Sequence, residues 1–215
     1  MKFKLPFFIE NKLLDKLCTV KVVAEISRHD VDGKLLHTHK QICHSLNANF
    51  LEAIYISMIE NLVQPQFGFS APFTSSIKML DLTNNYQTVS STNLLTAKGD
   101  TASDATGIVV GTGVPVVNPI TPALTAKIST GSGAGQLSYL QQSSAAGVTV
   151  LGNVSSLIMT RTWMNNSGGA ILVKEFGVQC GAGNRYLMLI DPVNPNQNVN
   201  SLQTLSISLT YSITT

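Results

Sequence analysis

The sequence predicts a mainly β protein: an antiparallel β-sandwich of the jelly-roll or Ig-like kind, with an N-terminal β-hairpin and one amphipathic α-helix. Residues 202–213 carry an apolar side chain at every second position from Leu205 to Ile213. This alternation indicates a strand with one buried face. Other β-like segments recur at roughly ten-residue spacing between turns rich in Gly and Asn, which is typical of antiparallel sandwiches. Only residues 50–62 show a clear helical period.

The first predicted element is a hairpin. Residues 17–27 are partly alternating, with apolar side chains on one face from Val20 to Ile26. The turn signal Asp30-Val-Asp-Gly33 follows, and residues 34–43 return as a second strand. Two strands alone are marginally stable, so we expect this hairpin to pack on other parts of the chain.

The predicted helix follows the hairpin. Ser45 or Asn47 is the expected N-cap, and Pro65 marks the end of the helix. Apolar residues at spacings of three and four form one stripe: Phe50, Leu51, Ile54, Tyr55, Met58, Ile59 and Leu62. We expect the helix and the hairpin to pack together.

Three regions are expected to form one compact unit: the hairpin and helix (1–63), a loop-rich connecting arm (64–106) and the sandwich (107–215). Short strands are predicted near 76–82 and 93–98 of the arm. Strands of the sandwich are predicted over 107–113, 134–142, 157–164, 170–179 and 202–213. Three prolines, at 115, 119 and 122, exclude a central strand there. In the strand 170–179, Ile171, Val173 and Glu175 are expected on one face, and Leu172, Lys174 and Phe176 on the other.

Charge is distributed unevenly. Residues 1–100 hold 10 basic and 9 acidic side chains, whereas residues 101–215 hold only four and three. Soluble domains normally keep ~25–35% of their surface charged, so the second part is expected to be covered by other subunits. The alternative is an uncharged surface in contact with solvent.

Several protein classes are excluded by composition. The net charge of +2 gives no electrostatic footprint for nucleic acid or anionic lipid. No apolar run reaches the ~18 residues of a membrane span, and the apolar stretch Leu5–Ile9 is too short for a signal peptide. Three scattered cysteines, Cys18, Cys43 and Cys180, fit synthesis in a reducing compartment.

Motifs for ligands are weak. The glycine loops 111–113 and 131–135 lack the Lys-Ser/Thr of a phosphate loop, so they are read as tight turns. His37 and His39 share one strand face, with Cys43, His44 and His29 nearby in sequence. Zinc needs three or four ligands, so exposed strand histidines are the better interpretation. We expect no metal and no cofactor.

Catalytic residues are not evident either. The chain has no Gly-x-Ser-x-Gly motif and no histidine after His44. The acids of the second part are Asp104, Glu175 and Asp191. Because Glu175 lies beside Lys174 and near Arg161 in the predicted sheet, a structural ion pair is expected there. We therefore do not expect an enzyme.

An ordered set of segments carries a resemblance. The set comprises residues 107–113, 131–139, Arg161-Thr-Trp-Met-Asn-Asn-Ser-Gly168, Ile171-Leu-Val-Lys-Glu-Phe-Gly177, 187–191 and 203–211. The order resembles a group of structural proteins of tailed bacteriophages, in which Arg-x-Phe-x-Asn-Asn-Ser-Gly precedes Val-x-Glu-x-Gly and an alternating strand ends the chain. The Glu-x-Gly strand is also similar to one in phage tail-fibre attachment domains. Residues 45–51 look like the matching front half, so the resemblance covers about 40–63 and 105–215.

The chain departs from that pattern in places. Trp163 stands where Phe is usual, Phe176-Gly-Val178 replaces Ile-Gly-Leu, and Asp191 lacks the Arg that often precedes it. The last difference removes an ion pair and leaves the role of Asp191 open. The group has no catalytic residues to carry over.

The resemblance implies a virion structural protein, made in the host cytoplasm and assembling with copies of itself and other virion proteins. It would be a capsid-associated (minor or decoration) or a tail or neck component, and a homo-oligomer. Trp163 is expected to be a core or interface anchor. Expected interface residues are aromatic: Trp163, Tyr139, Phe67, Phe69, Phe73 and Tyr211. The alternative function is a carbohydrate- or receptor-binding β module of a phage fibre.

Overall fold

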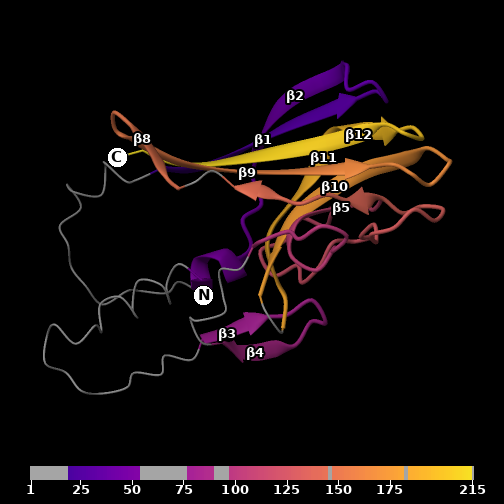
Figure 1. Cartoon of the computed structure of the whole chain (residues 1–215). Helices are drawn as coiled ribbons and strands as arrows, with labels where there is room; N and C mark the ends of the chain where they lie inside the picture. Colours follow the sequence, from indigo (N-terminus) through magenta and orange to yellow (C-terminus); the bar gives the residue numbers. More distant parts are fainter. Residues whose placement is uncertain (1–18, 54–76, 90–96, 145–146, 182–183, 215) are drawn as a thin grey trace, which may run out of the picture.

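The computed structural model describes residues 19–53, 77–89, 97–144, 147–181 and 184–214. It is mainly β, with antiparallel sheets and a short helix (Figure 1), which confirms the predicted fold class. Within these ranges no helix is both long and apolar enough to cross a membrane.

The larger sheet joins the two ends of the described chain. Its long strands are β1 (Thr19–His29), β2 (Leu35–Cys43), β9 (Val154–Met164) and β12 (Thr204–Thr214). The strand order is β2-β1-β12-β9-β6, where β6 is Ser138–Tyr139. Two further short strands, β7 (Ser143–Ser144) and β8 (Thr149–Leu151), also pair with β9.

The predicted hairpin is β1 and β2. Its turn is fixed by the carboxylate of Asp30, which accepts hydrogen bonds from the amides of Asp32 and Lys34, while Gly33 has φ +78°. The hairpin does not stand alone, because β1 pairs with β12 from Thr19–Thr214 to His29–Thr204. Val22, Ala24 and Ile26 are buried on the face that sequence alternation predicted.

The second sheet has the order β11-β10-β5, made of β11 (Tyr186–Val199), β10 (Ile171–Cys180) and β5 (Gly107–Gly111). In the central strand β10 the register shifts between Val173 and Glu175. Glu175 and Phe176 are both buried, so the predicted alternation of one inner and one outer face does not hold past Val173. Strand β11 was not predicted at all.

A third, small sheet pairs β3 (Ile77–Leu80) with β4 (Tyr86–Val89). The side chain of Asn49 binds both backbone groups of Leu80, at 2.8 and 3.0 Å, and the amide of Leu82 donates to the carbonyl of Arg185. Residues 77–89 therefore pack on the rest of the chain instead of extending as an arm. Residues 97 and 98, the described end of the second strand predicted in this region, are not in a strand.

A helix begins at Ala48 and is described to Ala53. Asn47 is its N-cap, since its Oδ1 accepts the amide of Asn49 at 3.2 Å. Ser45, the other candidate, donates its hydroxyl to Asp191. The ring of Phe50 stacks on Tyr211 of β12, with centroids 6.4 Å apart. Most of the predicted helical stripe, and Pro65, lie outside the described residues.

The two larger sheets share one hydrophobic core. The larger sheet contributes Ile26, Trp163, Leu205, Ile207 and Leu209, and the second sheet contributes Ile108, Val110, Phe176, Leu187 and Leu189, all essentially inaccessible to solvent. This arrangement is compatible with a β-sandwich. Whether it is jelly-roll or Ig-like stays a prediction.

Candidate functional site

The outward residues of β12 and β9 form a surface without ionisable side chains. On β12 they are Thr204, Ser206, Ser208, Thr210 and Ser212, and the buried residues Leu205, Ile207 and Leu209 lie between them. The register places Thr162 opposite Ser206 and Thr160 opposite Ser208, and the paired hydroxyl oxygens are 2.6 and 2.7 Å apart. Because these hydroxyls bind each other, the surface is polar but its hydrogen bonds are partly satisfied within the chain.

This surface continues across β1 and β2. We call the outward residues of the four long strands the outer sheet face; its rows are Thr38–Ser27–Ser206–Thr162, Lys40–Glu25–Ser208–Thr160, Ile42–Val23–Thr210–Ile158 and, without β2, Lys21–Ser212–Ser156. Its ionisable groups are on β1 and β2 alone, and two of them, Lys40 and Glu25, form an ion pair at 3.0 Å. The charge-poor second part of the sequence thus appears as a wide uncharged sheet face.

The buried cation Arg161 is a structural anchor. Its guanidinium donates to the carbonyls of five residues, at 2.5 to 3.2 Å: Leu140, Thr106, Ile108, Asp100 and Ser103. Burial lowers the pKa of Arg161, but a guanidinium stays charged at neutral pH. Arg161 therefore ties the loop 100–106 and strand β5 to β9.

The buried acid Glu175 is also used by backbone groups. Its Oε1 accepts the amide of Ala126 at 2.7 Å and its Oε2 the amide of Thr125 at 3.0 Å. The predicted ion pair with Arg161 or Lys174 is wrong: Arg161 is saturated by carbonyls, and no ion pair of Glu175 is found in the described part of the chain. Glu175 instead fixes the end of the loop 112–126.

Asp191, whose role the sequence left open, joins β11 to the end of β2. Its carboxylate accepts the amide of His44 at 3.0 Å, the hydroxyl of Ser45 at 3.2 Å and the thiol of Cys43. Desolvation by burial raises the pKa of Asp191 above its ordinary value, against these hydrogen bonds. All the donors are local structural groups.

The histidines are less exposed than predicted. The rings of His37 and His39 are partly buried with centroids 5.4 Å apart, and His39 Nε2 lies 3.4 Å from Gln41 Oε1. His44 uses its backbone amide toward Asp191, and His29 is the last residue of β1. In the described ranges, no three His, Cys, Asp or Glu side chains come together as metal ligands.

Two of the aromatic residues predicted for an interface lie in the core. Trp163 and Tyr139 are 0% and 1% exposed and pack edge to face, with centroids 5.7 Å apart. Neither offers surface to a second subunit, so of the two roles expected for Trp163 the core anchor is the one that its position fits. Tyr211 is partly buried. Phe67, Phe69 and Phe73 lie outside the described residues.

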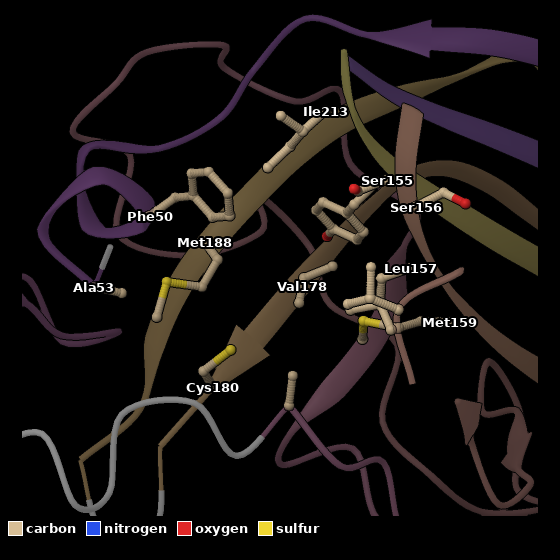
Figure 2. Close-up of a pocket in the computed structure, with 13 residues that line it drawn as sticks. Phe50, Ala53, Ser155, Ser156, Leu157, Met159, Val178, Cys180, Met188 and Ile213 are labelled. Carbon is tan, nitrogen blue, oxygen red and sulfur yellow. The ribbon is translucent and has the colours of Figure 1, made fainter. Parts of the chain in front are cut away.

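A pocket of about 430 Å³ lies where the helix meets the two sheets. Figure 2 shows Phe50 and Met188 on one side of it, Leu157 and Met159 on the other, and Val178 between them. Sequence reasoning missed this pocket, because its lining comes from segments far apart in the chain and has no motif.

The pocket walls are neutral. Burial raises the thiol pKa of Cys180, which lines the pocket, to about 12. Burial also raises the pKa of Tyr211, with smaller contributions from Cys180 and Cys43. Both groups are protonated at neutral pH, so the pocket can hold an apolar group but supplies no charged acid or base.

Comparison with known proteins adds no relative: no family model matches the chain, and neither curated proteins nor solved structures give a match. The functional argument therefore rests on the residues and on the resemblance noted in the sequence.

Proposed function

We propose that this chain is a non-enzymatic structural protein that works by assembling with copies of itself and with other proteins. In line with the sequence resemblance, we place it in the virion of a tailed phage, as a capsid-associated or a tail or neck component.

The observation that carries the proposal is the uncharged part of the outer sheet face. An isolated soluble protein keeps many charges on its surface, whereas the cores of protein interfaces are depleted of charge. Ser206, Ser208 and Thr210 are flanked by Thr160, Thr162 and Ile158 without one ionisable group. Covering this surface leaves no charge to desolvate without a partner, so contact with another subunit has a low electrostatic cost.

The buried charged groups support a structural role. Arg161, Glu175 and Asp191 each bind backbone amides or carbonyls, or neighbouring hydroxyl and thiol groups, at fixed points of the fold. A catalytic group has to reach a reacting atom of a substrate, and these three are at most 3% exposed. They hold the loops in place, as an assembly unit of defined shape requires.

The test is the mass of the purified full chain in solution, measured by light scattering across a concentration series. We expect multiples of the 23.0 kDa chain mass, and we expect Thr210→Lys to weaken association because it places a cation in the outer sheet face. Ser132→Lys, in an exposed loop, is the control that keeps the wild-type mass profile. A wild-type chain that stays monomeric at every concentration would contradict the proposal. Glycan binding by such a monomer would favour the receptor-binding alternative.

A further inference from the structure

Four sheet edges occur in the two larger sheets, and three of them are protected. The β9 side of the larger sheet ends in strands of two or three residues, and short edge strands are poor templates for pairing. The free side of β5 is covered by the segment 126–128, whose backbone bonds to Val110 and Thr112. These edges do not invite a further strand.

The third edge, β11, is protected by prolines and side chains. It contains Pro192 and Pro195, which cannot donate to a neighbouring strand. Gln41 donates to the carbonyl of Pro192 at 2.7 Å and accepts the amide of Asn194 at 3.0 Å, and Arg28 donates to the carbonyl of Asn198. The backbone of this edge is already in use.

Strand β2 is different. It is the outermost strand of the larger sheet (Figure 1), nine residues long, without proline, and pairs with β1 alone among the described residues. Its one charge, Lys40, is paired with Glu25. On the outer sheet face it exposes Leu36 (43%) and Ile42 (49%). A long apolar edge of this kind is a template for strand pairing.

We propose that β2 pairs antiparallel with β2 of a second copy about a two-fold axis at His39, so that the larger sheet continues across a homodimer. The inference rests on the proposed function and names the strand and register through which the copies meet. A two-fold contact of this kind is self-complementary, because the same surface serves both copies.

The register follows from the side chains. With His39 on the axis, Leu36 faces the second copy's Ile42, and Thr38 faces the second copy's Lys40. Exposed apolar residues then meet twice, which favours the pair. An axis at residue 40 would instead oppose two lysines, and an axis at residue 38 would oppose Leu36 and Lys40.

The inner side of the strand agrees with this register. It brings the second copy's Gln41 opposite His37, and the two His39 residues opposite each other. His37 Nε2 and His39 Nδ1 are buried atoms that lack a hydrogen-bond partner. The second copy supplies polar groups next to both.

The first experiment compares sedimentation of the full wild-type chain with the double variant Leu36→Lys, Ile42→Lys. We expect the dimer dissociation constant to rise by about tenfold or more, because lysines block edge pairing. Leu172→Lys is the matched control: Leu172 is 41% exposed, but on β10, and this variant should dimerise as the wild type does. Unchanged association of the double variant would overturn the β2 contact and leave assembly itself intact, whereas a monomeric wild type would overturn both proposals.

The second experiment tests the register by disulfide formation. Leu36→Cys and Ile42→Cys chains are mixed, oxidised mildly, and the linked peptides are identified by mass spectrometry. We expect a 36–42 link between chains in the mixture only, since equal positions lie six residues out of register, about 20 Å apart. The wild-type chain, with its own three cysteines, sets the background. A dominant 36–36 or 42–42 link would overturn the proposed axis.

Discussion

The guanidinium of Arg161 lies over the aromatic ring of Tyr139, with its Cζ 4.7 Å from the ring centroid. The hydroxyl of Tyr139 in turn donates to the carbonyl of Ile128 at 2.7 Å. This pair joins β9, β6 and the loop after β5 in one buried contact. A cation over a ring in a dehydrated site contributes to stability in addition to the hydrogen bonds.

Replacing Arg161 by lysine should destabilise the fold by about 3 kcal/mol or more. Lysine has three donors, so at least two of the five carbonyls would lose their partner, and the ammonium cannot match the planar fork. Chemical denaturation measures the loss, with the exposed Arg185→Lys as the control expected within ~0.5 kcal/mol of wild type. Equal stability of both variants would show that Arg161 is not an anchor.

Replacing Glu175 by glutamine should cost roughly 1–3 kcal/mol, because one of the two amides it holds would face an NH₂ group instead of an oxygen. Gly111 and Gly113 pack so closely on Glu175 that there is no room for the side chain to turn aside. The control is Glu25→Gln, which breaks an exposed ion pair worth about 0–1 kcal/mol. Hydrogen exchange at Thr125 and Ala126 should rise in the Glu175 variant alone.

The strands with a local signal were predictable. Residues 202–213 and the hairpin 17–43 alternate with period two, and a strand with one buried face produces that pattern without information from elsewhere. Asn47 is likewise a local N-cap signal. The uncharged face followed from the lack of charged residues, since the alternate residues of β12 and β9 are Ser and Thr.

The remainder depended on distant parts of the chain. Strand β11 is buried on both faces from Tyr186 to Asp191, so it shows no alternation, and its prolines are tolerated only because it is an edge. Glu175 and its amide partners are 49 and 50 residues apart. Neighbouring charges suggested an ion pair, but the fold brought backbone groups to Glu175 first.

Gly177 should not tolerate a side chain, although its backbone is an ordinary strand. A Cβ there would lie 2.7 Å from the carbonyl oxygen of Leu189 and from Leu124 Cδ1. We expect Gly177→Ala to cost about 1–3 kcal/mol through overpacking. Gly169→Ala is the control, because nothing lies within 4 Å of its Cβ. Thermal unfolding of the two variants side by side distinguishes this steric effect from a general effect of glycine replacement.

Two buried carboxylates should give opposite pH dependences of stability. The pKa of Asp81 lies below 3.8, chiefly because its carboxylate accepts the amide of Asn85 and then the hydroxyl of Thr83. The pKa of Asp191 lies above 3.8 because burial disfavours its charge. A lowered pKa means that the folded state binds fewer protons than the unfolded chain, and a raised pKa means that it binds more.

The contribution of Asp81 should therefore be fully present above the unfolded pKa and disappear as the pH falls from 3.8 through its folded pKa. The contribution of Asp191 should be most favourable below 3.8 and decline as the pH rises from there through its folded pKa. Urea unfolding across the acid range measures this as the difference in unfolding free energy between wild type and Asp81→Asn, and between wild type and Asp191→Asn. The first difference should increase with pH and the second decrease. Two slopes of the same sign would contradict the assignment of hydrogen bonding to one carboxylate and desolvation to the other as the dominant cause.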